Sequence, residues 1–233
     1  LSSLYGMTAL LMLAAWKLGP LAWLPAMVGV GLLQHAWFLL LHEGTHGALH
    51  PNRNVNNWVA EWLVALPIGL RFRTYNLYHQ RHHRYTRAAT DPEISMFGEV
   101  AHDSVLRTLL EIFTGITVIR MLLWFMRFAH EARSAGVLTG SLLGDLLATT
   151  VAWTPWMILV SALSAPWMFV LFWLVPLSVV FPIVSIVQSY AEHPMGPQAT
   201  TDEFARTATT RLGFLLDLVV HPFYSGEHLA HHL

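Results

Sequence analysis

The chain has 233 residues, of which 55% are hydrophobic and only 12% are charged. A soluble domain usually carries about 25% charged residues, so the composition argues against a surface fully exposed to water and favours lipid as the solvent. The formal net charge of −1 provides no basic stripe for nucleic acid. The absence of cysteine excludes disulfides, thiolate metal sites and iron–sulfur clusters built from this chain.

Four apolar stretches are each about long enough to cross a hydrocarbon core, which takes roughly 20 helical residues. The first is slightly short, and Lys17 to Pro20 and Ser161 to Pro166 form turns that pair the four as two helical hairpins. The predicted spans are Leu4 to Trp16, Leu21 to Leu41, Ser141 to Leu163 and Trp167 to Val187. The sequence therefore predicts an all-α membrane protein.

Two further apolar stretches are poor candidates for spans. Trp58 to Leu70 is short and contains Glu61 and Pro67, and Val105 to Ala129 carries four charged residues. A central arginine costs about 2.5–3.5 kcal/mol even on lenient insertion scales. We expect both stretches to form helices in the membrane interface, with their arginines reaching towards the headgroups.

The order of these segments predicts the side on which the polar residues lie. Of the 13 basic residues, 12 are arginine, and with four spans all 12 arginines lie on one side while Lys17 lies opposite. The positive-inside rule makes the arginine side cytoplasmic. We expect one domain over residues 1–233, with a natural protein that extends beyond both ends because Leu1 begins inside an apolar run.

Histidine occurs 14 times, and nine of these residues fall into four short clusters on the predicted arginine-rich side. The clusters read HEGTH from residue 42, HQRHH from residue 79 and HLAHH from residue 228, and YAEH ends at residue 193. Residues at i, i+3 and i+4 share one helix face, so each cluster can direct several imidazoles to one place. The nine candidate ligands are His42, His46, His79, His82, His83, His193, His228, His231 and His232.

The number of clustered histidines helps to identify the metal. A catalytic zinc takes about three protein ligands, far fewer than nine, whereas two six-coordinate ions offer about a dozen positions. Imidazole binds zinc, copper, iron and nickel alike, so nitrogen ligands alone do not identify the metal. Iron with dioxygen can oxidise a saturated chain, and this chemistry suits a pocket that faces lipid.

The three boxes resemble those of the membrane fatty acid desaturase and hydroxylase superfamily, which includes alkane hydroxylases and carotenoid ketolases. The resemblance covers nearly the whole chain, and it includes the HHRYTRAATDPE segment after the second box and the YAEHPMG segment. Ser189 departs from the pattern, because some acyl-CoA desaturases have an asparagine there. The resemblance implies a non-haem di-iron centre held by the nine histidines, with dioxygen as co-substrate.

The resemblance also implies partners. The substrate would be an acyl chain or a similar lipid, and electrons would come from an external ferredoxin, rubredoxin or cytochrome b5 docking on the arginine-rich face. Metal-bound histidines usually donate their second N–H to a carboxylate or carbonyl, so acids and one histidine near the boxes are candidate supporting residues. These are Glu43, Asp91, Glu192, Asp217, His221 and Glu227.

Several functions remain open on the sequence alone. Desaturation is favoured by the two H-x-x-H-H boxes and by Asp91-Pro92, while hydroxylation or ketolation of an alkane, lipid or carotenoid would use the same centre. HEGTH also fits the zinc metalloprotease motif with Glu43 as the base. A metal transporter is a further alternative, although transport favours ligands at the middle of the membrane. His35 is interpreted as a hydrogen-bonded helix residue rather than as a ligand.

Overall fold

The computed structural model describes residues 1–100, 104–163, 165–193 and 206–232. Within these ranges the helices are joined by turns and loops and there is no strand, which confirms the all-α prediction. The first half contains α1 (Ser2–Leu18), α2 (Pro20–Thr45), α3 (Arg53–Val59), the π-helix η1 (Ala60–Ala65), the 3₁₀ helix η2 (Leu66–Ile68), α4 (Phe72–Tyr85) and α5 (Pro92–Val100). The second half contains α6 (Val105–Phe113), α7 (Ile116–Ser134), α8 (Leu142–Ala162), α9 (Trp167–Phe169), the π-helix η3 (Val170–Leu174), α10 (Val175–Glu192), α12 (Phe214–Val220), the 3₁₀ helix η4 (Pro222–Tyr224) and α13 (His228–His232).

Three continuous helical segments are long and apolar enough to cross a membrane, namely Pro20–Thr45, Leu142–Ala162 and Trp167–Glu192. The pair α6 and α7 also passes this test together, but its two helices are bent by 83° at the break between them. The helix α1 matches the predicted first span and has 17 residues, which makes it slightly shorter than these three. By length and composition, the described residues therefore contain three candidate membrane spans, or up to four if the bent pair is one span.

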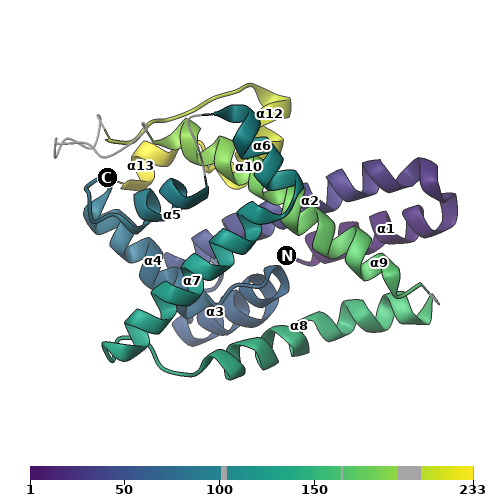
Figure 1. Cartoon of the computed structure of the whole chain (residues 1–233), viewed down its shortest axis with the longest axis horizontal. Coiled ribbons are helices and arrows are strands. Elements are labelled where there is room, and N and C mark those ends of the chain that lie inside the picture. The colour runs from purple at the N-terminus through teal and green to yellow at the C-terminus, as the bar shows by residue number, and fades with distance from the viewer. Residues whose placement is uncertain (101–103, 164, 194–205, 233) are drawn as a thin grey trace.

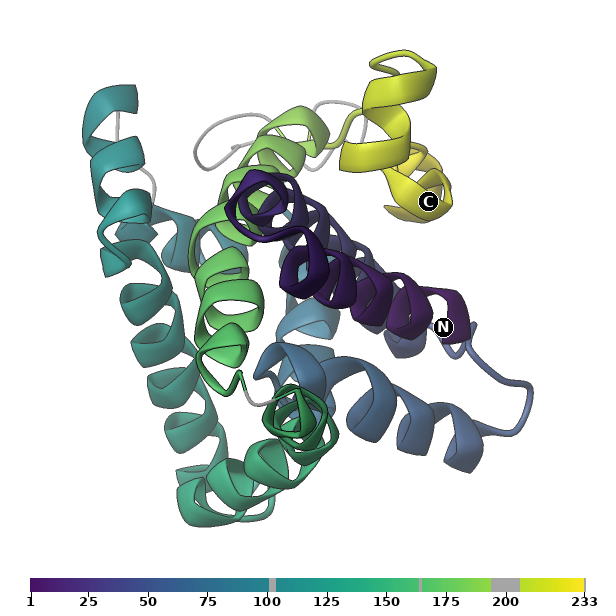
Figure 2. The ribbon, with the colours of Figure 1, turned by 90° about the vertical axis from the view of Figure 1, so that its right-hand side faces the viewer.

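The helix α2 lies at the centre of the fold and packs against α1 on one side and α10 on the other (Figures 1 and 2). The approach to α10 is close because a Cβ atom at Gly31 would overlap the side chain of Val180. Small residues are what allow such close backbone contact between membrane helices. Nearby, the buried indoles of Trp37 and Trp173 meet edge to face at 5.6 Å. This packing fixes the ends of α2 and α10 relative to each other.

The helix α4 starts at a position set by an acid from another element. Glu61, in η1, accepts a hydrogen bond from the backbone N–H of Phe72 at 2.8 Å and pairs with Arg71 at 2.6 Å. A carboxylate at a helix N-terminus satisfies free N–H groups and interacts favourably with the helix dipole. Asp145, in the first turn of α8, pairs with Arg71 and with Arg133. These ion pairs link α4 to the start of a predicted span.

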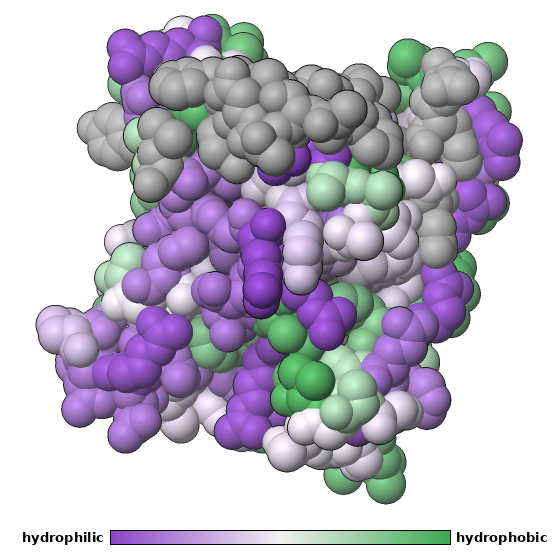
Figure 3. Space-filling model, turned by 90° about the vertical axis from the view of Figure 1, so that its left-hand side faces the viewer, coloured by the Kyte–Doolittle hydropathy of each residue, from purple (hydrophilic) through white to green (hydrophobic). Residues whose placement is uncertain are grey.

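The polar surface gathers at one end of the molecule. Figure 1 shows α4, α5 and α13 together at the end where the C-terminus lies, and the face seen from that side is largely hydrophilic (Figure 3). By contrast, α8 exposes many of its apolar side chains, such as Leu143, Leu147 and Ile158. The fold thus separates an apolar body, suited to lipid, from a polar end that carries the histidine clusters.

Candidate metal centre

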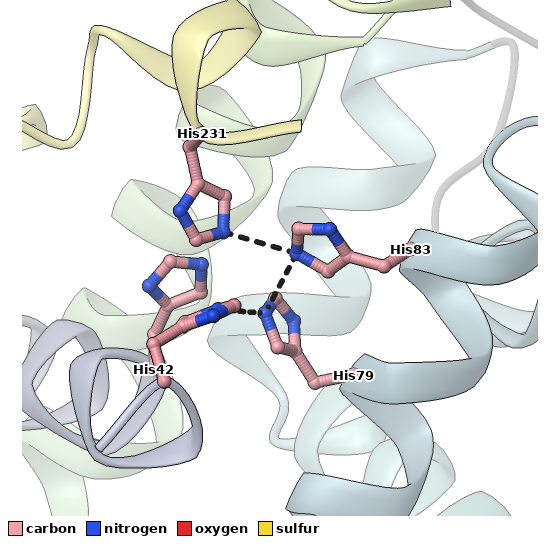
Figure 4. Close-up of side chains that lie close together, drawn as sticks. His42, His79, His83 and His231 are labelled. Carbon is pink, nitrogen blue, oxygen red and sulfur yellow. Dashed lines mark hydrogen bonds between the residues drawn. The ribbon is translucent and has the colours of Figure 1, made fainter. Parts of the chain in front are cut away.

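The nine histidines converge at the polar end and form two adjacent groups. Within each group, every residue offers one nitrogen that lies within 4.8 Å of the others. The first group contains His42, His46, His79, His83 and His231, and the second contains His82, His193, His228 and His232. Figure 4 shows the rings of four labelled members of the first group, from three different helices, turned towards one another.

Helix geometry explains how one box serves both groups. In α4, His79 and His83 are four residues apart and belong to the first group, while His82 belongs to the second. In α13, His228 and His232 are likewise four residues apart and share the second group, while His231 joins the first. Residues at i and i+4 lie nearly on one line along a helix, and i+3 lies to one side. The H-x-x-H-H spacing therefore bridges two neighbouring centres.

The separations between nitrogens in the first group fit a bound cation. Nε2 of His79 lies 2.8 Å from Nε2 of His46 and 2.9 Å from Nε2 of His83. Nε2 of His83 also lies 3.0 Å from Nε2 of His231. Neighbouring ligands of a six-coordinate ion with metal–nitrogen bonds of about 2.1 Å are about 3.0 Å apart, against about 3.4 Å around a tetrahedral ion. The observed distances match the six-coordinate case.

The second group has the same internal spacing. Nε2 of His193 lies 3.2 Å from that of His82 and 2.9 Å from that of His228. Nε2 of His232 lies 3.0 Å from that of His228. A neutral imidazole has only one N–H to donate, so a ring whose other nitrogen already donates presents a lone pair here. The donor set and its spacing therefore fit a transition metal in each group.

The outer nitrogens of several rings have partners that fix the ring orientation. His82 Nδ1 donates to the Asp91 carboxylate at 3.1 Å, and His193 Nδ1 donates to the carbonyl of Arg206 at 2.9 Å. His42 Nδ1 lies 3.2 Å from Glu43 Oε1. Carboxylate and carbonyl acceptors of this kind set the tautomer, so that Nε2 is left as the ligand atom.

Burial keeps most of these imidazoles neutral. It is the largest cause that lowers the pKa of His83 and of His231, each to about 3, and it lowers the pKa of His79 and His228 well below the ordinary value. His82 differs: burial acts to lower its pKa, but the charges of Glu93 and Asp91 outweigh burial and raise the pKa. Neutral imidazole is the form that binds a metal.

The proposed supporting residues separate into two sets. Besides Glu43 and Asp91, Glu192 is near the centre, with Oε2 3.7 Å from His228 Nδ1. The other three, Asp217, His221 and Glu227, have partners outside the two histidine groups. Asp217 accepts from the backbone N–H of Leu212 and pairs with His221 at 3.3 Å, and Glu227 pairs with exposed Arg211 at 2.6 Å. These acids lie close to the third box in sequence, but their side chains turn to local partners.

Sequence reasoning did not select Glu93, which the structure places against the second group. Its carboxylate Oε2 lies 3.1 Å from His82 Nδ1 and 3.6 Å from His193 Nε2, and Oε1 accepts from the Ser189 hydroxyl at 2.8 Å. The available signal was its place two residues after Asp91 in the DPE segment. His82, Asp91 and Glu93 could form a further metal group, but His82 Nδ1 donates to Asp91 and is therefore unavailable as a ligand.

A narrow cavity of about 80 Å³ lies beside both groups. It contacts His42 and His79 of the first group and His82, His193 and His228 of the second. Much of the remaining wall is apolar and includes Phe38, Met96, Phe97, Met121 and Phe181. An apolar ligand in this cavity would therefore lie next to both candidate metal positions.

Most of the chain matches a known protein family. Residues 18–233 match the sequence model of a family described as fatty acid desaturase. No curated protein matches the chain at a significant level. The matched range contains every histidine of the two groups and all three continuous candidate spans.

Proposed function

The chain belongs to the fatty acid desaturase family, and from this premise we propose that it desaturates an acyl or similar lipid chain at a non-haem di-iron centre. Membership confirms the resemblance predicted from the three boxes. It makes the chain an integral membrane oxidoreductase of the desaturase and hydroxylase type. Family membership therefore favours an oxidoreductase over a zinc protease as the function to which the HEGTH motif belongs.

The observation that carries the proposal is the apolar cavity that contacts both histidine groups. In the proposed complex, Phe38 and Phe181 contact the alkyl chain, and their apolar surface excludes water from the reacting carbons. His79 and His82 border the cavity from adjacent positions on α4. A methylene held between these two rings would lie close to both metals.

The chain's residues would hold and orient the cofactor. His42, His46, His79, His83 and His231 would hold one iron, and the second group would hold the other. When bound, the irons supply the capacity to reduce dioxygen with two external electrons and to oxidise two C–H bonds. Desaturation balances with one dioxygen, two electrons and two protons consumed, and one double bond and two waters formed. Asp91 keeps the His82 N–H on the side away from the metal.

We place the centre on the cytoplasmic side because the arginines lie at this end of the predicted topology. The polar end presents a hydrophilic surface (Figure 3), and the helix α4 at this end has the exposed residues Arg73, Arg81 and Arg84. A carrier with an acidic surface, such as a ferredoxin, rubredoxin or cytochrome b5, would be attracted to it. The proposed electron donor is one of these three types.

The test is product analysis in cells that express the chain and are fed lipids of different chain lengths. We expect a product that has lost two hydrogens, while a product that has gained one oxygen would indicate hydroxylation instead. His79→Ala should reduce product at least about hundredfold through loss of a metal ligand. His130→Ala, which changes an exposed histidine outside both groups, should leave the yield unchanged. A purified protein that holds one zinc, or no metal, would overturn the proposal.

A further inference from the structure

The two histidine groups differ by one donor. The first offers five nitrogens and the second offers four, although the boxes that build them are alike in spacing. A six-coordinate ion at the first group would keep one open position. The same ion at the second group would keep two, unless another residue of this chain supplies a ligand.

Glu93 lies beside the second group and is held there from two sides. Asp91 Oδ1 accepts from the backbone N–H of Glu93 at 2.8 Å, which fixes the start of α5. The Ser189 hydroxyl, on α10, donates to Glu93 Oε1 at 2.8 Å. The side chain is 11% exposed, so these contacts hold a carboxylate in a site largely closed to water.

The second carboxylate oxygen of Glu93 has no hydrogen-bond donor among the described residues. Oε2 lies 3.1 Å from His82 Nδ1, but the N–H of that ring is directed to Asp91. Leaving a buried charged oxygen without a donor is costly, because its hydration has been lost without compensation. Oε2 is therefore free to bind a cation or a water molecule.

This oxygen lies beside the second group rather than within it, at a distance from which it can reach a cation held there. Oε2 lies 3.6 Å from His193 Nε2, somewhat longer than the spacing between the ligand nitrogens of the second group. We propose that Glu93 is an oxygen ligand of the metal held by the second group, so that each metal has five ligands from the chain and one open position. This inference rests on the proposed function, since it requires that both groups hold iron.

The proposal makes the two irons chemically different. One has only neutral nitrogen ligands from the protein, while the other also has an anionic oxygen. Ligand charge and type tune a metal site, so iron-57 Mössbauer spectra of the reduced protein should contain two distinguishable signals. Ser189 acts as a positioning residue, because it holds the carboxylate in place without contacting the metal.

Glu93→Gln tests the ligand directly, because it keeps the size of the side chain and removes its charge. We expect a shift of one Mössbauer signal only, and release of one of the two irons to a chelator about ten- to hundredfold faster. The matched control is Glu131→Gln, at an exposed position on α7, which should behave as the unchanged protein. Unchanged spectra and release rates in Glu93→Gln would overturn the inference.

A second variant keeps the test decisive if Glu93→Gln fails to fold. Ser189→Ala frees Glu93 Oε1 but leaves the carboxylate charge in place, so the same signal should shift by a smaller amount. No shift in Ser189→Ala would also contradict the inference. Failure of the proposed function looks different, since the unchanged protein would then lack two irons. If the unchanged protein holds two irons and neither substitution alters their Mössbauer signals or release rates, the proposed role of Glu93 is wrong. The proposed function is not affected by that result.

Discussion

His35 is a polar residue that lies fully buried in the apolar helix α2. Its Nε2 donates to the carbonyl of Val220 at 3.0 Å, and its Nδ1 lies 3.3 Å from the Ser185 hydroxyl. The carbonyl can only accept, so Nε2 carries the proton and Nδ1 accepts from the serine. One side chain thus ties α2 to α10 and to the end of α12, the helix that leads to the third histidine box.

We predict that His35→Leu weakens the position of the third box. The substitution leaves the Val220 carbonyl and the Ser185 hydroxyl without this partner, which costs about 1–3 kcal/mol for each buried group. The melting temperature in detergent should fall by several degrees, and iron should be released faster because α13 is held less firmly. His130→Leu, at an exposed site on α7, is the control. Equal melting temperatures and equal iron release in the two variants would argue against this role.

The sequence identifies the candidate ligands and their local spacing, but it does not predict contacts between residues that are distant in the chain. The sequence predicts a hydrogen-bonded His35, yet its partners Ser185 and Val220 are 150 and 185 residues away, and no local pattern identifies them. Glu93 was missed for the same reason, since its importance depends on how α5 lies against α10. Asp217 was chosen for its nearness to the third box, but its carboxylate accepts from a neighbouring turn instead.

The stretch Val105 to Ala129 contains a break between two helices that its hydropathy does not predict. It was treated as one apolar stretch, but the structure divides it into α6 and α7 at Thr114 and Gly115, where Gly115 has a φ of 77°. That left-handed conformation favours glycine. Glu111 bridges the bend by pairing with Arg107 at 3.1 Å and with Arg120 at 3.2 Å. Partners for these arginines lower the cost of placing them near lipid.

The convergence of the boxes also limits how often the chain crosses the membrane. His82 and His193 lie on the same side, because their Nε2 atoms are 3.2 Å apart. The number of crossings between them must therefore be even. The candidate spans Leu142–Ala162 and Trp167–Glu192 supply two, and a crossing by α6 and α7 would make three. An interfacial position for the bent pair keeps the number of crossings even.

Cysteine labelling tests this arrangement, and the chain contains no cysteine of its own. We predict that Ser104→Cys and Ser134→Cys, which flank the bent pair, react with a membrane-impermeant thiol reagent from the same side. Lys17→Cys, in the last turn of α1, should react from the opposite side. All three positions are exposed, so burial should not prevent the reaction. Reaction of Ser104→Cys and Ser134→Cys from opposite sides would contradict the prediction.

The candidate metal centre joins elements that are far apart in the chain. The nine histidines come from α2, α4 and α13 and from the end of α10. Ligands that bind only the folded state stabilise it, so two irons would act as cross-links between these helices. The sequence predicts that the four clusters lie on one side, because the chain crosses the membrane an even number of times between them. It did not predict the division into groups of five and four, which depends on the orientations of α4 and α13.

The same crowding of histidines should make the metal-free protein sensitive to acid. Burial lowers the pKa of His83 and His231 to about 3 in the folded protein, while an unfolded histidine has a pKa of about 6.5. Below about pH 6.5 the unfolded chain therefore binds more protons, and stability falls as pH falls towards about 3. His82, whose pKa is raised, acts in the opposite direction, but histidines with a lowered pKa outnumber it.

We therefore predict that the melting temperature of the metal-free protein falls between about pH 7 and about pH 5, as measured by circular dichroism in detergent. Replacing one titrating group, in His83→Gln or His231→Gln, should make this decline shallower because one fewer proton is taken up on unfolding. His130→Gln should decline as steeply as the unchanged protein, since this histidine is exposed. If all four proteins show the same slope, protonation of the buried histidines is not the cause of the acid sensitivity.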